Sequence, residues 1–228
     1  MQQIPMDLSF RSAQGRDNFF ISKSNQLAAE WIDRWPDWPG QIQALNVVGD
    51  PGSGKSHLAA VWQEQSGAVK ISNPDGDMVH SVVEENGKVP CFILDNMTPQ
   101  TTDDEALFHF LNAIMSVRGS LLILSPSPIA QMTWGLADLL SRLKAINVVQ
   151  IGLPDDVLLF ALLEKFFIER QLVAPHNMLH YIVSRMDRSF SAVHKIGTAL
   201  DREALAGKKN LSVNLARDVL HKQLEIGF

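Results

Sequence analysis

The stretch "GDPGSGKS" at residues 49–56 decides the fold, because it fits the pattern G-x-x-x-x-G-K-[ST] without a mismatch. It follows the apolar run "ALNVVG" (44–49), which is typical of a buried strand, and it opens "GKSHLAAVWQEQ" (54–65), which is typical of a helix. A strand, a glycine-rich loop and a helix in this order form the context that a phosphate-binding loop requires. The alternative is a chance glycine-rich turn, and the matching strand and helix argue against it.

The residue types of this loop suit the binding of a nucleotide. Its glycines let the backbone turn and bring N–H groups against phosphate oxygens, and the helix N-terminus adds positive potential. Lys55 can reach the β- and γ-phosphates, and the hydroxyl of Ser56 can bind Mg²⁺. We therefore expect ADP or ATP with Mg²⁺ as the cofactor. The predicted cofactor-binding residues of the loop are Gly49, Asp50, Pro51, Gly52, Ser53, Gly54, Lys55, Ser56 and His57.

Another apolar run, "CFIL" (91–94), is followed directly by Asp95 and Asn96. A buried strand that ends in a carboxylate can deliver an acid to a magnesium-nucleotide site, so Asp95 is predicted to bind Mg²⁺ together with Ser56. A turn residue at the end of a strand is the alternative for Asp95. Many ATPases carry an acid at the next position, where it orients the attacking water. Asn96 can donate or accept a hydrogen bond there but cannot take a proton from water.

Apolar runs alternate with helical segments over the first two-thirds of the chain. The runs cover residues 44–49, 68–72, 89–96, 120–126 and 145–152. Runs without polar alternation imply strands buried on both faces, hence a parallel sheet with helices on each side. After Pro154 the pattern is helical only. The sequence therefore predicts an N-terminal tail at 1–16, an α/β domain with a five-stranded parallel sheet at 17–153, and a small helical domain at 154–228.

Composition and charge limit the classes of function. Hydrophobic residues make up 46% of the 228 residues, which is enough for a sizeable core. The net charge is −5, and no basic cluster extends beyond Lys208-Lys209, so little direct DNA binding is expected. The single cysteine, Cys91, lies in an apolar run and is expected to be a buried hydrophobic residue. No signal-peptide pattern or membrane-spanning run is visible, so we expect a cytoplasmic protein without membrane contact.

The order of these motifs resembles that of the AAA+ module of the DnaA replication-initiator family, over nearly the whole chain. Within this family the chain looks most like the Hda-like regulators, which lack the DNA-binding domain and share the form "FILDN" (92–96). The resemblance implies an AAA+ P-loop NTPase fold in which the C-terminal helices form a lid. The expected lack of a DNA-binding domain agrees with the negative charge.

Three further segments carry predicted site residues by this resemblance. "DNFFISKSNQLAAEW" (17–31) is similar to the family's segment that packs against adenine, which implies that Phe20 and Ile21 line the base pocket. "GLADLLSRL" (135–143) is similar to the arginine-finger helix, and Arg142 matches the finger. "MDRSFSAVHKIGTALDREAL" (186–205) resembles the third lid helix, with Arg188 at the sensor-2 position. Each arginine alone would also fit an ordinary surface charge, and the order of the segments favours the functional roles.

The N-terminal stretch "QIPMDL" (3–8) resembles the short peptide with which Hda proteins bind the DNA polymerase sliding clamp, the beta subunit. The implied anchors are one amide and three apolar side chains, a combination that suits a surface pocket. These partner-binding residues are Gln3, Ile4, Met6 and Leu8. An untethered tail is the alternative.

The resemblance implies a negative regulator of replication initiation that binds adenine nucleotide. With the sliding clamp, such a protein stimulates ATP hydrolysis by DnaA through an arginine finger supplied in trans, the process called regulatory inactivation of DnaA. The chain departs from the family at sensor 1, where Pro126 in "LSPSP" (124–128) replaces a polar residue. Together with Asn96, this departure implies weak or absent intrinsic ATPase activity.

Other readings of the sequence remain open. An AAA+ loader or adaptor ATPase similar to DnaC could act on another replication partner. A small-molecule kinase would need an arginine-rich lid within the sheet region, and a nucleotide-independent scaffold would not need the intact "GKS" (54–56). The sequence does not decide between a homodimer and an AAA+ oligomer.

Overall fold

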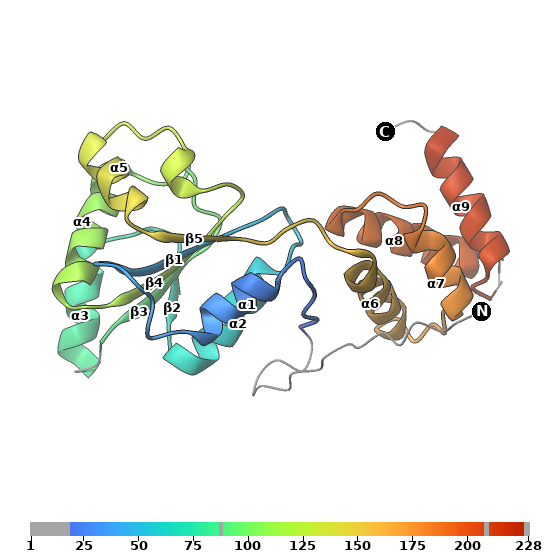
Figure 1. The fold of residues 1–228 in the computed structure, drawn as a ribbon, viewed down its shortest axis with the longest axis horizontal. Coiled ribbons are helices and arrows are strands. Elements are labelled where there is room, and N and C mark those ends of the chain that lie inside the picture. Colours follow the sequence, from blue (N-terminus) through green and yellow to red (C-terminus); the bar gives the residue numbers. More distant parts are fainter. Residues whose placement is uncertain (1–18, 87–88, 208–209, 226–228) are drawn as a thin grey trace.

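A five-stranded parallel sheet forms the centre of the first part of the chain (Figure 1). The structure is a computed structural model, and it describes residues 19–86, 89–207 and 210–225. The strands are β1 (Gln43–Val48), β2 (Val69–Ile71), β3 (Cys91–Leu94), β4 (Ser120–Ser125) and β5 (Asn147–Gln150). Their order across the sheet is β2-β3-β4-β1-β5, and all four pairings are parallel. The predicted α/β fold with a five-stranded parallel sheet is therefore confirmed.

The order of the strands puts β1 at the point where the chain changes direction across the sheet. β1 pairs with β4 on one side and with β5 on the other, and Val48 at its end is level with Ser125 and Gln150. In open α/β sheets, ligands bind beyond the carboxyl ends of the strands at such a switch point. The glycine-rich loop follows β1 directly, so the topology carries it to this position.

Helices cover both faces of the sheet. On one face α1 (Gln26–Asp33) and α2 (Lys55–Ser66) share a core with Leu45 and Val47 of β1. On the other face α3 (Gly76–Asn86), α4 (Asp104–Ser116) and α5 (Ala137–Lys144) share a core with Ala44 of the same strand. Successive side chains of a strand point to opposite faces, so the apolar run supplies both cores. A short 3-10 helix, η1 (Ile129–Gln131), follows β4.

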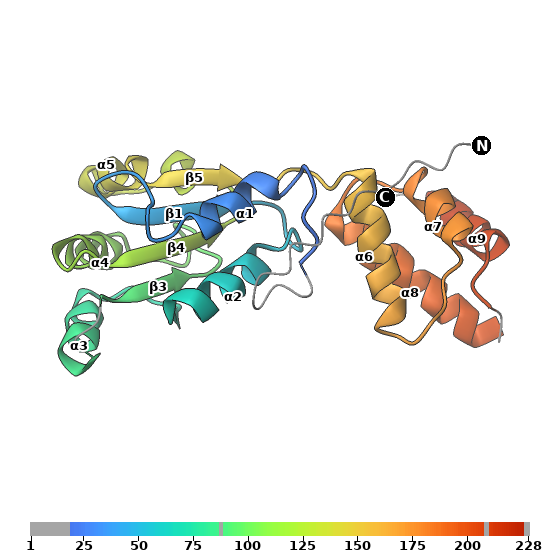
Figure 2. The same cartoon turned by 60° about the horizontal axis from the view of Figure 1, so that its bottom comes forward.

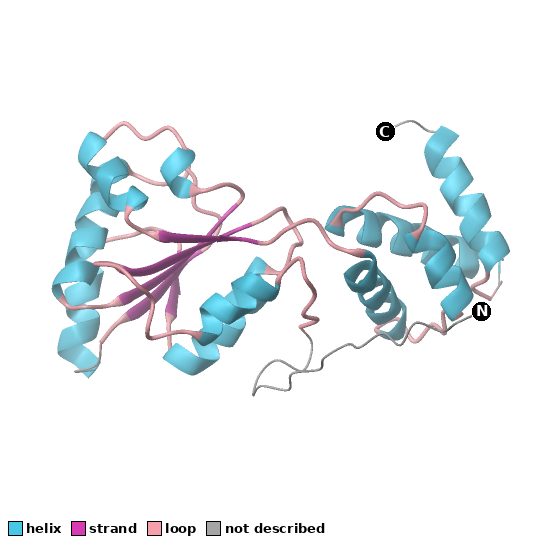
Figure 3. Cartoon of the chain, in the orientation of Figure 1, coloured by secondary structure: helices cyan, strands magenta, loops and turns pink. Residues whose placement is uncertain are grey.

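The last four helices form a separate bundle beyond the carboxyl ends of the strands (Figures 1 and 2). They are α6 (Asp156–Ile168), α7 (His176–Val183), α8 (Phe190–Gly207) and α9 (Val213–Glu225). Their inward residues build a third core, in which Leu159, Phe167 and Leu200 are fully buried. Figure 3 shows the change from a mixed α/β layer to helices alone. None of the helices in the described ranges has the length and apolar character to cross a membrane.

Candidate nucleotide-binding site

The loop at 49–56 has the backbone shape that its glycines predict. Gly52 and Gly54 have φ angles of 80° and 95°, and Gly54 is the N-cap of α2. These angles lie in the left-handed region, which L side chains rarely adopt. A Cβ atom at Gly49 would lie 2.6 Å from the hydroxyl oxygen of Ser53, so the first glycine is needed for space. The loop thus turns its backbone N–H groups into a cradle at the start of α2.

Lys55 lies across its own loop. Its Nζ donates hydrogen bonds to the carbonyl oxygens of Gly49 at 2.6 Å and Asp50 at 2.9 Å. Burial lowers the pKa of Lys55, and the carboxylates of Asp95 and Asp50 partly oppose this effect. The ammonium of Lys55 therefore lies at the loop, where the lysine of this motif binds the β- and γ-phosphates.

Asp95 lies at the end of β3, and it has a partner that the sequence analysis did not foresee. Its Oδ2 forms an ion pair of 2.6 Å with Nζ of Lys70, which lies on the neighbouring strand β2. Ser56 is exposed at the start of α2. No group of three or more His, Cys, Asp or Glu side chains that could hold a metal is found in the described residues. Mg²⁺ at this site would therefore depend on nucleotide phosphates, the Ser56 hydroxyl and the remaining oxygen of Asp95.

The residues before α1 lie against the loop. Phe19 stacks on His57 with ring centroids 5.1 Å apart, and its Cε2 atom would lie 3.0 Å from a Cβ atom at Gly54. Burial lowers the pKa of His57, and Lys165 lowers it further, which favours the neutral ring. Sequence reasoning missed Phe19, because two adjacent phenylalanines carry the same pattern and only the fold separates their directions.

Asn25 holds this segment in place. Its Nδ2 donates to the carbonyl oxygen of Phe20 at 2.8 Å, and its Oδ1 accepts from the backbone N–H of Ser22 at 2.8 Å. Asn25 as a residue is 2% exposed, so these bonds form where water cannot compete. Phe20 and Ile21 are half-buried and pack against the core shared by α1 and α2. Their predicted contact with adenine stays a prediction.

The start of α8 connects the lid to the loop. Phe190 is buried, and its Cβ would lie 3.3 Å from a Cβ atom at Gly52. Arg188 is exposed two residues earlier, and its Nη2 lies 3.0 Å from Oδ1 of Asp156 at the start of α6. A cavity of about 330 Å³ lies between loop and lid, lined by Gly52, His57, Leu162, Lys165, Phe166, Glu169, Phe190, Val193 and His194. The fold thus brings the predicted sensor-2 turn to the predicted loop.

The end of β4, where the family carries sensor 1, is fixed by a buried polar network. Asn46 of β1 is fully buried, donates from Nδ2 to the Ser125 hydroxyl at 2.8 Å and accepts from the backbone N–H of Ile129 at 3.1 Å. The Ser125 hydroxyl in turn donates to the carbonyl oxygen of Ser127 at 2.7 Å. Pro126 is exposed and has no polar side-chain group. This strand end therefore offers the loop no free hydroxyl from Ser125.

Arg142 is not brought to the loop of its own chain. It is half-buried on α5, whose Leu139 and Leu143 pack into the core on the face opposite α2. Among the described residues, its guanidinium has no hydrogen-bond or ion-pair partner. The predicted clamp-binding residues Gln3, Ile4, Met6 and Leu8 lie outside the described residues.

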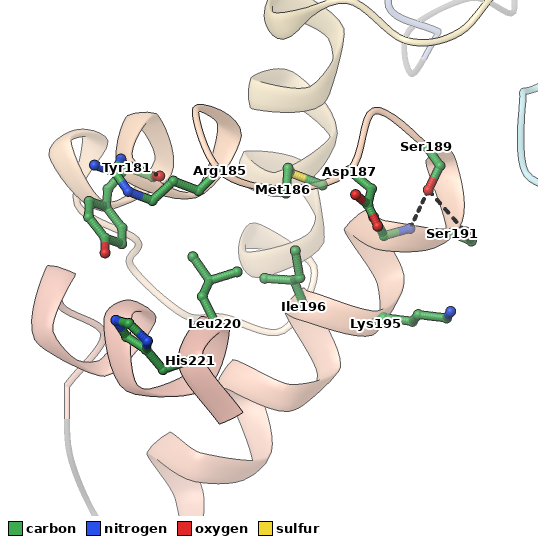
Figure 4. Close-up of a pocket in the computed structure, with 11 residues that line it drawn as sticks. Tyr181, Arg185, Met186, Asp187, Ser189, Ser191, Lys195, Ile196, Leu220 and His221 are labelled. Carbon is green, nitrogen blue, oxygen red and sulfur yellow. Dashed lines mark hydrogen bonds between the residues drawn. The ribbon is translucent and has the colours of Figure 1, made fainter. Parts of the chain in front are cut away.

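A second cavity, of about 410 Å³, lies within the lid (Figure 4). It is lined by Tyr181, Arg185, Met186, Asp187, Ser189, Ser191, Ala192, Lys195, Ile196, Leu220 and His221. In Figure 4 the side chains of Met186, Ile196 and Leu220 meet at its centre, while Arg185 lies beside the ring of Tyr181. The Arg185 guanidinium is 4.0 Å from the centroid of that ring. This cavity borders the turn that carries Arg188 but shares no lining residue with the glycine-rich loop.

Curated proteins that are similar to the chain in sequence include a chromosomal replication initiator. No family model matches the chain. The chromosomal replication initiator protein DnaA of Tropheryma whipplei, strain Twist, is 26% identical over 227 residues, which cover 90% of this chain and 47% of the relative. DnaA of strain TW08/27 gives the same values. The chain thus spans about half the length of the curated relatives it matches.

Solved structures share the fold. Domain III of DnaA from Thermotoga maritima has a TM-score of 0.66 at 16% identity, covering 90% of this chain and 94% of that one. AMPPCP-bound DnaA from Aquifex aeolicus has a TM-score of 0.58 at 18% identity, with coverage of 83% and 65%. The Holliday junction branch migration motor RuvB from Thermotoga maritima has a TM-score of 0.60 at 10% identity, with coverage of 78% and 61%. The chain therefore has the AAA+ fold of DnaA domain III, and its sequence is similar to DnaA over most of its length.

Proposed function

We propose that the chain is an adenine-nucleotide-binding regulator that stimulates ATP hydrolysis by a DnaA-type initiator. The observation that carries the proposal is the position of Arg142. This arginine has no partner among the described residues, and it lies on α5, across the sheet from its own α2. An arginine in this position can serve a nucleotide on another subunit and cannot easily serve its own.

The nucleotide of the chain itself is proposed to act mainly as a structural ligand. Lys55 and the loop N–H groups would bind the phosphates of the nucleotide. Asp95 would face the Mg²⁺ bound to these phosphates, and Arg188 would reach the nucleotide from the lid. Phe20 and Ile21 would contact the base. Two solved DnaA structures contain AMPPCP, an ATP analogue, which supports the same ligand class here.

Weak self-hydrolysis is part of this proposal. Asn96 stands where an acid would orient a water molecule. The hydroxyl of Ser125 is already engaged in the network with Asn46. Nucleotide bound at such a site would persist and hold the lid against the sheet. A stable angle between the two parts would keep α5 in one orientation for the partner.

The partner step is proposed to be electrostatic. Arg142 would approach the γ-phosphate of ATP held by DnaA, where negative charge increases in the transition state. An arginine supplied in trans raises the rate of such reactions by roughly 10³–10⁵. The sliding clamp, bound through Gln3, Ile4, Met6 and Leu8, would restrict this step to replicated DNA.

The test measures ATP hydrolysis by DnaA with the chain and clamp loaded on DNA, comparing wild type with Arg142→Ala. We expect the substitution to abolish stimulation and to leave nucleotide binding by the chain unchanged. Lys144→Ala is the matched control, because Lys144 is an exposed cation on the same last turn of α5. Stimulation that survives in Arg142→Ala would refute the finger assignment.

Wild-type protein that gives no stimulation would refute the regulator itself. Single-stranded DNA binding with ATP turnover in that experiment would instead favour the loader or adaptor class similar to DnaC.

A further inference from the structure

Lys70 places a positive charge at the metal side of the proposed nucleotide site. Its Nζ lies 2.6 Å from Oδ2 of Asp95, the carboxylate predicted to serve Mg²⁺. The Lys70 side chain is 57% exposed and that of Asp95 is 25% exposed, so the pair faces the open end of the sheet. The sequence motifs assign no role to this lysine.

The register of the sheet explains why Lys70 reaches Asp95. Lys70 of β2 is level with Ile93 of β3, and Asp95 follows Ile93 by two residues. Side chains two apart on a strand point to the same face, and diagonal neighbours on adjacent strands lie within reach of a long side chain. Ile93 belongs to the core that contains α2, so Lys70 and Asp95 share the face from which the glycine-rich loop begins.

Asp95 is therefore already paired with a cation of the chain. Lys70 contacts it from the edge of the sheet, while Lys55 donates to the carbonyl oxygens of Gly49 and Asp50 in the loop. Mg²⁺ demands near-octahedral coordination by oxygen atoms, keeps several of its waters, and is usually bound through one or two carboxylates and the substrate phosphates. A lysine ammonium is a compact point charge that binds phosphate in its own right. Here it engages one of the two Asp95 oxygens and would repel a divalent ion beside it.

We propose that Lys70 takes over the charge-neutralising role of Mg²⁺, so that the chain binds adenine nucleotide without a tightly held metal ion. Its ammonium neutralises Asp95, while the loop and Lys55 bind the phosphates. The inference rests on the proposed nucleotide binding and adds its metal dependence. Nucleotide bound in this way resists removal of divalent ions, and its hydrolysis is slow because Mg²⁺ is poorly placed.

The experiment measures binding of a fluorescent ADP analogue, mant-ADP, in excess Mg²⁺ and in excess EDTA. For wild type we expect the two dissociation constants to differ by less than about threefold, since a protein cation supplies the charge. For Lys70→Met we expect EDTA to weaken binding by about tenfold or more, because Asp95 is then left without a cation at its side. Lys70→Arg keeps the charge and should behave as wild type.

The matched control is Lys222→Met in the lid. Lys222 pairs with Glu203 at 3.1 Å, with exposures of 59% and 35%, so it forms an ion pair of similar exposure away from the loop. Its removal should leave the EDTA response unchanged. A second measurement, electron paramagnetic resonance of Mn²⁺, should detect more metal in the ADP complex of Lys70→Met than in that of wild type.

The outcomes separate the two proposals. A wild type that loses mant-ADP in EDTA as strongly as Lys70→Met refutes the role of Lys70 and leaves nucleotide binding intact. A wild type that binds mant-ADP in neither condition, with Lys55→Ala equally inactive, refutes nucleotide binding and with it the inference. Equal Mn²⁺ content in both nucleotide complexes also overturns the role of Lys70.

Discussion

Asn96 has a φ angle of 56°, in the left-handed region that few residues other than glycine adopt. It is exposed at the end of β3, directly after Asp95. Asparagine is enriched several-fold in this conformation. The turn after β3 therefore gives Asn96 a structural role beside the proposed loss of hydrolysis, because its backbone favours residues that adopt this angle.

This account of Asn96 predicts how stability responds to substitution. Asn96→Gly should change the free energy of unfolding by no more than about 0.5 kcal/mol, since glycine adopts the same angle without strain. Asn96→Val should lower it by about 1–2 kcal/mol, because a β-branched residue is strained in the left-handed region. Urea unfolding of the three proteins measures the difference. Equal stability of the valine and glycine variants would contradict the argument.

The sequence predicted the roles of some single residues and missed those of others. Lys55 and Asp95 are recognisable because their neighbours along the chain form a strand, a loop or a helix. Asn46 lies inside an apolar run, and nothing local indicates that it bonds to Ser125, 79 positions away. Lys70 looks like any exposed lysine until the register of β2 against β3 is known. The missed contributions all depend on partners that are distant in sequence.

At the scale of elements, patterns predicted which segments form helices better than where the helices end. The helix expected at 102–119 is α4, Asp104–Ser116, which starts later because the carboxylate of Asp103 accepts from the N–H of Ala106 and caps it. The weak pattern at 74–86 does form α3, Gly76–Asn86, since packing against α4 supplies the stability that propensity lacks. The segment 174–186 yields a short α7, His176–Val183. Caps and tertiary contacts set these limits.

Gly197 lies where the lid helices α6 and α8 approach each other closely. A Cβ atom at this position of α8 would lie 2.6 Å from Cδ1 and Cε1 of Phe166 on α6. The Phe166 ring is held, because the Arg170 guanidinium lies 3.6 Å from its centroid and donates to the Phe166 carbonyl at 3.1 Å. Glycine in mid-helix costs about 1 kcal/mol of helix propensity relative to alanine. In return for this cost, α6 and α8 can pack closely, because glycine has no side chain that would hold them apart.

Gly197→Ala should therefore destabilise the lid despite the gain in helix propensity. Overpacking costs about 1–3 kcal/mol and the gain in helix propensity offsets about 1 kcal/mol of it, so the net loss in the free energy of unfolding is expected to be up to about 2 kcal/mol. Adding Phe166→Leu should recover part of this loss, and a double-mutant cycle by thermal unfolding measures the coupling. A Gly197→Ala protein that is more stable than wild type would mean that the ring moves aside freely.

At the scale of the whole molecule, the sheet region and the lid have separate cores joined at a small contact. Phe190 starts α8 in the lid, yet it is buried in the core shared by α1 and α2. Leu158 of α6 belongs to the same core. Leu162 packs against both this core and the core of the lid. The two parts are thus held together by a few apolar side chains next to Gly52 of the loop. Nucleotide bound at this place would add contacts to both parts at once.

This arrangement predicts that Phe190 couples the lid to nucleotide binding. Phe190→Leu should weaken the affinity for mant-ADP several-fold, because a looser contact at Gly52 lets the lid move away from the phosphates. The matched control is Phe167→Leu, since Phe167 is fully buried in the core of the lid and is not part of the core shared by α1 and α2. Each substitution should lower the free energy of unfolding by roughly 1–1.5 kcal/mol, because deleting buried groups loses transfer free energy and leaves a cavity.

Only the Phe190 variant should bind mant-ADP less well at a temperature where both variants are folded. Nucleotide should also raise the melting temperature of Phe190→Leu less than that of Phe167→Leu, because stabilisation by a ligand follows its affinity for the folded state. Equal losses of affinity in the two variants would mean that general stability of the lid, and not its contact with the loop, governs nucleotide binding.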